Sequence, residues 1–206
     1  HGKTEEDLKN LEDSHVEPIV NDMVDSGISQ AELDLYLIAR HAKERNAHIA
    51  SINPDMPDGG SGMTNLEASR VLLATRRDKR FRDFQRVARR VDAMLSVRRE
   101  KIREAGLEDA GLIDAWEQKY QHYVPLKGFA ANETEDGKPL ATGKGFAIKG
   151  RESMRAMGRR SLPDSPLAHA VADTTQSLVR FRKNEVGQAL LRMVEENPDP
   201  NFWQVF

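Results

Sequence analysis

The sequence predicts an all-α protein, a multi-helix bundle with one irregular or β-hairpin insertion. Two observations predict this class. Apolar residues recur three, four and seven positions apart in successive stretches of the chain, as they do on the buried face of a helix. Two of these stretches follow a serine or threonine with a glutamate three residues later, which is the pattern of a capped helix N-terminus. Successive amphipathic helices bury their apolar faces by packing as a bundle.

The composition also excludes several classes of protein and of functional site. A chain of 206 residues with 31% charged and 6% aromatic residues is long enough for one sizeable core. It has no cysteine, which excludes a disulfide framework, a thiolate metal site and a cysteine nucleophile. No apolar run approaches the roughly 20 residues that a membrane-spanning helix needs. Because the chain begins with His1 and not with methionine, we expect it to be part of a longer protein.

The first two helices are predicted by the spacing of apolar residues and by the capping residues and prolines that begin or end a helix. A helix over about residues 4–24 contains Pro18, which would kink it or split it in two. Ser29 and Glu32 then form a capping box that opens a central helix, and this helix ends near residue 53, before a proline. Because the connection between them is short, we expect the two helices to pair as an antiparallel hairpin.

Four more helices follow a glycine-rich turn. Thr64 caps a short helix, and a long basic helix follows over about residues 78–105. A further helix is predicted over about residues 109–120. A serine and a proline begin the last one, which runs over about residues 165–196.

These elements predict a single helical domain over residues 1–206. A run rich in glycine and without helical spacing interrupts it, and a β-hairpin turning at Asp136-Gly137 is one form the run can take. The predicted parts are a helical core over 1–122, an irregular or hairpin insertion over 123–162, a long C-terminal helix over 163–197 and a tail over 198–206.

The central helix carries the first candidate site. His41, Glu44 and Arg45 share one helix face with His48, since residues three and four apart are neighbours there. The H-x-x-E pair suits a histidine oriented by a carboxylate. The alternative is a half-buried histidine that only packs. We assign no catalytic residue with certainty, name His41, Glu44, Arg45 and Tyr123 as candidates, and predict no metal and no cofactor.

The glycine-rich turn is the second candidate. A loop of small residues that leads into a helix N-terminus leaves backbone amides pointing one way, which favours an anion. The alternative is a tight connector between two antiparallel helices. No strand precedes the turn and no Gly-Lys-Ser/Thr follows it, which excludes both common nucleotide-binding motifs. The residues concerned are Gly59, Gly60, Ser61, Gly62 and Thr64.

Charge asymmetry supplies the third candidate. Residues 1–36 hold ten acids and two lysines, a net charge of −8, whereas residues 70–103 hold thirteen bases and four acids, a net charge of +9. The basic helix either pairs with the acidic segment or meets a polyanion such as DNA. The likeliest phosphate contacts by sequence are Arg76, Arg77, Arg80, Arg86, Arg89 and Arg90.

Three segments, Tyr36–Asn46, Met56–Thr64 and Tyr120–Gly128, resemble a region of very large polyvalent or internal virion proteins of tailed bacteriophages and mobile elements. The resemblance implies a helical associated domain that acts in the virion or the bacterial host cytoplasm, with other domains of the same protein or virion proteins as partners. It carries no known activity. It adds weight to the positions within its motifs, which are His41, Glu44, Arg45, Asn46, Gly59, Gly60, Ser61 and Tyr123.

The expected function is therefore a structural or interaction module of a large multidomain phage protein. One alternative is a nucleic-acid-binding module that uses the basic helix over 76–103. The other is an enzyme domain with its site at His41, Glu44, Arg45 and the glycine loop, which requires those side chains to converge in one pocket.

Overall fold

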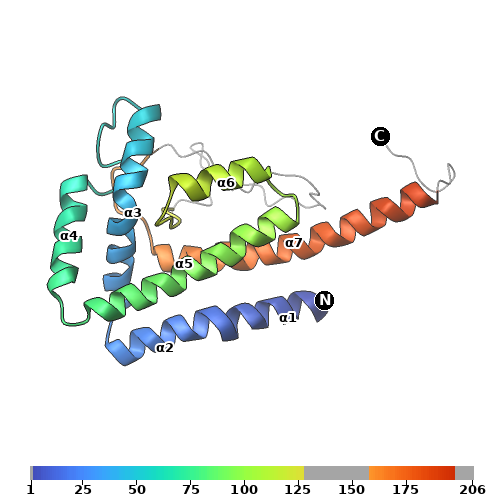
Figure 1. Ribbon diagram of the computed structural model, residues 1–206, viewed down its shortest axis with the longest axis horizontal. Helices are drawn as coiled ribbons and strands as arrows, with labels where there is room; N and C mark the ends of the chain where they lie inside the picture. The colour runs from blue at the N-terminus through green and yellow to red at the C-terminus, as the bar shows by residue number, and fades with distance from the viewer. Residues whose placement is uncertain (1, 128–157, 198–206) are drawn as a thin grey trace.

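The computed structural model describes residues 2–127 and 158–197 of the chain (Figure 1). The regular elements among these residues are α1 (Gly2–Leu11), the π-helical turn η1 (Glu12–Val16), α2 (Glu17–Ser26), α3 (Gln30–Ile52), α4 (Asn65–Arg77), α5 (Phe81–Glu104), α6 (Ala110–Lys119) and α7 (Pro166–Glu196). Since α1, η1 and α2 run on as one rod, the described residues form six helices. The predicted all-α class is confirmed.

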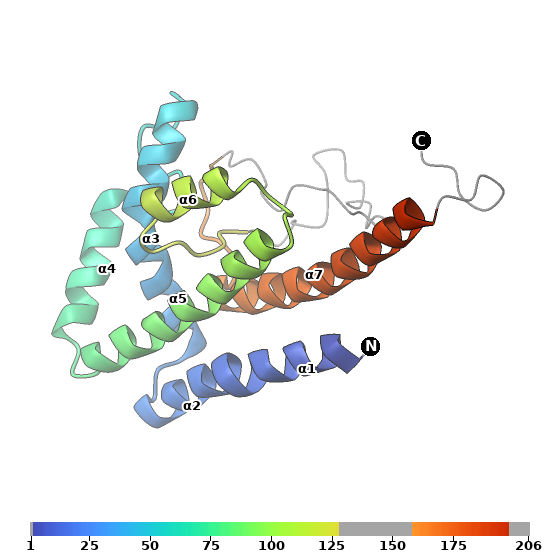
Figure 2. The same ribbon diagram turned by 45° about the vertical axis from the view of Figure 1, so that its right-hand side comes forward.

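The π turn η1 accommodates Pro18. Proline has no amide hydrogen, and in a regular helix its ring collides with the carbonyl group four residues earlier. That carbonyl belongs to Ser14 and lies inside η1, where the wider hydrogen-bonding pattern relieves the crowding. The sequence predicted a kink or a split at this proline. The π turn divides the helix into α1 and α2, which stay nearly in line (Figure 2).

α3 is the central helix, and its side chains are buried on every side over one turn. Residues 36–39 are all buried, which at 3.6 residues per turn covers the whole circumference. The predicted capping boxes are both present. The amide of Ser29 donates to the Glu32 carboxylate over 2.8 Å, and the amide of Thr64 donates to the Glu67 carboxylate over 2.8 Å. The starts of α3 and α4 are thus fixed locally.

The antiparallel hairpin predicted for the first two helices is wrong. α2 packs along α5, whereas α3 packs against α4, α5 and α7. Both views show α2 crossing the start of α3 at a steep angle (Figures 1 and 2). One reason is that Asp22 of α2 pairs with Arg86 and Arg90 of α5, beside the core cluster that α2, α3 and α5 share. A short connection limits the distance between two helices but does not choose their partners.

α5 and α7 pack side by side through the middle of the molecule (Figure 1). The largest core cluster joins them to α2 and α3, and a second, smaller cluster includes Ile102 near the end of α5 and Phe181 midway along α7. The buried carboxylate of Asp173 on α7 binds Lys127, and Arg98 of α5 lies 3.6 Å from it. The buried charge is therefore paired from both sides.

Only the ends of the predicted insertion are described. Residues 123–127 are irregular, which is one of the two forms that the sequence predicted for the insertion. The chain is described again from Gly158, and an isolated parallel bridge joins Arg159 to Ser61 of the glycine loop. The hairpin predicted at Asp136-Gly137 and the predicted tail over 198–206 lie outside the described residues.

Candidate functional site

The polar face of α3 converges as a cluster beneath two tyrosines. His41 is only 1% exposed, and its Nδ1 lies 3.3 Å from Oε2 of Glu44. The rings of Tyr120 and Tyr123 meet the His41 ring edge-on, with centroid distances of 5.4 and 5.6 Å. Edge-on packing of this kind stabilises aromatic groups in a core. The imidazole is enclosed on all sides.

The environment keeps His41 neutral. Burial lowers its pKa below the ordinary value of 6.5, and the hydrogen bond that His41 makes to Glu44 opposes this shift without reversing it. For Glu44, burial raises the pKa, but hydrogen bonds from His41 and from the amides of Gln121 and His122 outweigh it and leave the pKa lowered. A neutral imidazole thus donates its Nδ1 proton to an ionised carboxylate.

Arg45 and His48 extend this cluster along α3. Burial raises the pKa of the Tyr120 hydroxyl, and the charge and a hydrogen bond of Arg45 oppose that rise. Nε of Arg45 is buried and has no hydrogen-bond partner within the described ranges. His48 Nδ1 lies 2.7 Å from Nζ of Lys119, so the end of α6 is attached to α3.

Side chains with the chemistry of an acid–base pair therefore do come together, but they contact one another. Glu44 uses both carboxylate oxygens on His41 and on the backbone at residues 121 and 122. A general base needs its acting atom within hydrogen-bonding reach of a substrate, whereas His41 lies under the two tyrosine rings. No group of three or more histidine and acidic side chains is placed to hold a metal ion in residues 2–127 and 158–197.

Asn46 attaches the glycine loop to α3. Its side chain is 1% exposed, and its Oδ1 accepts a 2.7 Å hydrogen bond from the Ser61 amide. Its Nδ2 lies 2.9–3.1 Å from the Met63 carbonyl and from side-chain oxygens of Asp58 and Asn65. One amide side chain thereby ties together the start, the middle and the end of the loop.

Seven amides of the loop and of the first turn of α4 have acceptors within the protein. Asp58 accepts from the amides of Gly59 and Asn65 over 2.8 and 3.1 Å. Its carboxylate therefore lies at the N-terminus of α4, where a bound anion would otherwise lie. Five more amides donate to neighbouring groups of the loop and to side chains, and they belong to Ser61, Gly62, Met63, Thr64 and Glu67. This arrangement favours the connector interpretation over the anion site.

Two loop glycines are required by close approach. A Cβ atom at Gly60 would come within 2.5 Å of the Ile49 side chain on α3. Gly62 has φ +90°, and a Cβ atom there would come within 2.1 Å of the Ser161 carbonyl oxygen. The glycines let the loop pack between α3 and the returning chain at residues 158–161, with Arg159 N donating to the Gly60 carbonyl over 3.0 Å.

The basic residues divide into two groups. In the first group the guanidinium is paired with an acid: Arg80 binds Glu32 and Asp78, and both Arg86 and Arg90 bind Asp22. These pairs confirm that the acidic N-terminal segment contacts the basic helix. Arg76, Arg77 and Arg89 make up the second group and are exposed, with no ion pair among the described residues. Lys79 and Arg82, which the sequence did not single out, are exposed in the same way.

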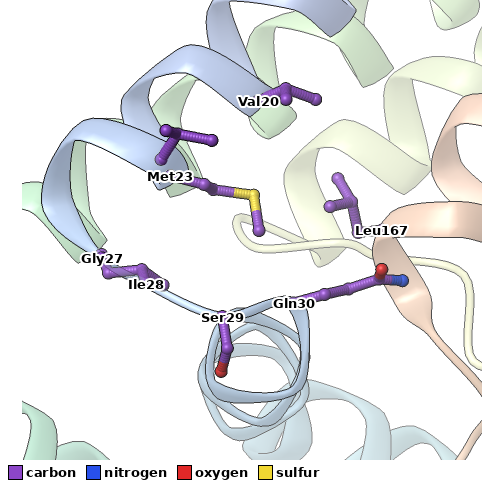
Figure 3. Close-up of a pocket in the computed structure, with 8 residues that line it drawn as sticks. Val20, Met23, Gly27, Ile28, Ser29, Gln30 and Leu167 are labelled. Carbon is purple, nitrogen blue, oxygen red and sulfur yellow. The ribbon is translucent and has the colours of Figure 1, made fainter.

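An apolar groove opens at another part of the surface, where α2 ends and α7 begins. It has a volume of about 430 Å³. Figure 3 shows Met23 and Leu167 on either side of it, with the connection from α2 to α3 beside them. A hydrogen bond of 2.7 Å from Gln30 to Ser165 joins α3 to α7 at this place. The groove residues, which we call the α2–α7 groove, are Val20, Met23, Val24, Gly27, Ile28, Ser29, Gln30 and Leu167.

Sequence reasoning missed the partners that come from distant segments. Arg159 reaches the glycine loop from about a hundred positions away, and no local pattern signals that contact. The role of Asp58 could have been predicted, because an aspartate ahead of glycines commonly accepts hydrogen bonds from the amides that follow it. For Asp173, the only signal in the sequence is an acidic residue at a position on the buried face of its helix.

Comparisons with protein-family models, curated proteins and solved structures find no match for this chain. The resemblance to phage proteins therefore stays a prediction from the three motif segments. None of the helices in the described residues is both long enough and apolar enough to cross a membrane.

Proposed function

We propose that this chain is an interaction module of a large multidomain bacteriophage protein that acts in the virion or in the bacterial host cytoplasm. Its partners are other domains of the same protein or other virion proteins. The phage context comes from the motif resemblance, and the role comes from the surface of the bundle.

The observation that carries the proposal is the α2–α7 groove. Val20 and Val24 lie one turn apart on α2, and their side chains are 48% and 73% exposed beside the groove. Isolated apolar side chains on a surface are ordinary, but adjacent ones that border an apolar groove mark a contact site. The groove suits an apolar side chain or helix face of a partner.

A second surface supports the same role. The C-terminal part of α7 extends past the ends of α1 and α5 in both views (Figures 1 and 2). Val186, Leu190 and Met193 lie on one stripe of this part, four and three residues apart, and are exposed. A helix that presents apolar side chains away from its own bundle is suited to packing against another domain.

The enclosed state of the α3 cluster argues against the enzyme alternative. Its candidate residues His41 and Glu44 are hydrogen-bonded to each other, His41 is covered by Tyr120 and Tyr123, and Glu44 accepts from the amides of residues 121 and 122. They explain how α3, α6 and residues 120–124 hold together. No atom of theirs that could serve as a general acid or base is directed at a substrate.

Hydrogen exchange tests the proposal in the longer protein that contains this chain. Amides of α2 should exchange more slowly in the longer protein than in the isolated domain, because a bound partner covers the groove. Val24→Asp should restore the fast exchange. Asn21→Asp is the matched control, since it adds the same charge at an exposed position on the same helix. Equal exchange of α2 in both contexts would refute the groove as an internal docking site.

A further inference from the structure

Five exposed cations lie at the junction of α4 and α5 and along the first half of α5. Arg76 and Arg77 end α4, Lys79 lies in the turn, and Arg82 lies in the first turn of α5 (Figure 1). Arg89 follows Arg82 by seven residues, which is two turns and about 10 Å along the same helix face. We call these five residues the α4–α5 basic corner.

The basic corner differs from the other arginines of α5 in its electrostatics. Arg86 and Arg90 lie 3.1 and 2.6 Å from the Asp22 carboxylate of α2. Burial raises the pKa of Asp22, and both arginines lower it further than burial raises it. The five corner residues have no carboxylate within ion-pair distance among the described residues, so their charge faces solvent.

The side chains beside these cations indicate which polyanion fits the surface best: single-stranded nucleic acid, a lipid surface or a duplex. Single-stranded nucleic acid is held by aromatic side chains on which the bases stack, but on α5 Phe84 is buried and Phe81 is partly buried. A lipid surface is held by several apolar side chains beside the cations. In the described structure α5 has no exposed large apolar residue, and on α4 only Leu73 is large, apolar and exposed within one turn of Arg76 and Arg77. A rigid helix of 24 residues with cations on its outer face suits regularly spaced phosphates of a duplex.

We propose that the α4–α5 basic corner binds the phosphate backbone of double-stranded nucleic acid, without reading its sequence. Arg76, Arg77, Lys79, Arg82 and Arg89 make the contacts. Asp22 holds Arg86 and Arg90 on the protein and so limits the affinity. This surface is independent of the groove that carries the proposed function.

The test is a titration of a fluorescently labelled DNA duplex by fluorescence anisotropy at salt concentrations from about 50 to 200 mM. We expect the logarithm of the binding constant to fall with the logarithm of salt with a slope of about −4 to −5, as for five phosphate contacts. The double variant R82E/R89E should bind at least tenfold more weakly. R82Q/R89Q, which removes the charges without adding repulsion, should weaken binding in the same direction and lower the slope by about two.

The control variant K3E/K9E makes the same change in net charge on α1, where both lysines are exposed. It should leave binding within about twofold of the starting protein. Asp22→Asn should tighten binding and steepen the slope, because it releases Arg90 and leaves Arg86 paired with Asp83 alone. Circular dichroism melts confirm that each variant is folded.

Four outcomes overturn the proposal. The first is no duplex binding at the lowest salt, and the second is an equal loss of binding in K3E/K9E and R82E/R89E. The third is tighter binding to the single strand than to the duplex. The fourth is binding to vesicles of phosphatidylserine without binding to the duplex, which would assign the corner to a membrane surface.

Discussion

Asn46 and Ser61 are joined by a buried hydrogen bond of 2.7 Å, from the Ser61 amide to the side-chain oxygen of Asn46. This contact attaches a loop of mostly small residues to the central helix. It makes the glycine loop part of the core and ties its shape to the position of α3.

Asn46→Ala should lower the free energy of unfolding by about 2–4 kcal/mol, because it leaves the Ser61 amide and the Met63 carbonyl buried without this partner. Urea unfolding followed by circular dichroism measures the change. Asn10→Ala is the control, since Asn10 is exposed on α1. An Asn46→Ala variant as stable as the control would show that water replaces the lost contacts.

Gly60→Ala should destabilise the protein by more than Gly106→Ala. A methyl group at Gly60 would meet Ile49 at 2.5 Å, whereas Gly106 has φ +61° and open space around it. The Gly106 variant therefore reports only the cost of the left-handed backbone, about 1 kcal/mol. Thermal melts of the two variants measure the difference. Equal losses would mean that α3 and the loop separate easily.

The stability of the protein should fall as the pH drops below about 6.5. Burial lowers the pKa of His41 in the folded protein, so the unfolded chain takes up a proton that the folded chain excludes. Above this range both states are neutral and the effect vanishes. Burial also lowers the pKa of His15 and of His48, which adds to the effect.

Urea unfolding at pH 7 and at pH 5 measures this dependence. His41→Gln should flatten it, and His169→Gln is the matched control at a site outside the cluster. A His41→Gln variant with the full pH dependence would place the proton uptake at other histidines.

Arg80→Ala should lower the melting temperature, and Arg77→Ala should leave it unchanged. Arg80 donates to the Gly27 carbonyl over 2.7 Å and binds Glu32, which closes the corner between α2, α3 and α5. Its hydrogen bond, together with the hydrogen bonds from Ser29, lowers the pKa of Glu32 to about 2. Because that pKa lies below the ordinary 4.5, the contact stabilises the protein above pH 4.5 and is lost as the pH falls toward 2. Similar melting temperatures for the two variants would contradict this assignment.

Local signals in the sequence predicted the helices well. The capping boxes at Ser29 and Thr64 and the proline that follows Ser165 place three helix starts within one residue of the structure. Each of these signals works through hydrogen bonds or backbone angles within four residues. Such contacts do not depend on the rest of the fold.

Helix pairing could not be predicted in the same way. The choice of α5 over α3 as the partner of α2 depends on Ile19 and Asp22 meeting side chains more than sixty positions away. The candidate site shows the same limit. The sequence placed His41 beside Glu44, but the enclosure by Tyr120 and Tyr123 depends on where α6 ends.

The charge pattern gave information about the net charge of whole segments but not about single residues. It left open whether the basic helix pairs with the acidic segment or meets a polyanion, and the ion pairs of Asp22 and Glu32 support the first alternative for part of the helix. It could not tell Arg89 from Arg90, adjacent residues of which one faces solvent and one faces Asp22. That distinction needs the position of α2.

The returning chain at residues 158–164 has a wider consequence. The Asp164 amide donates to the Lys127 carbonyl over 2.9 Å, and Arg159 donates to the Gly60 carbonyl. The described residues on the two sides of residues 128–157 therefore lie close together. Lengthening a segment whose two ends are held together costs little, about 0.6 kcal/mol for each doubling. Evolution can exchange the stretch between these anchors for another as a cassette, while the helical frame keeps its own packing.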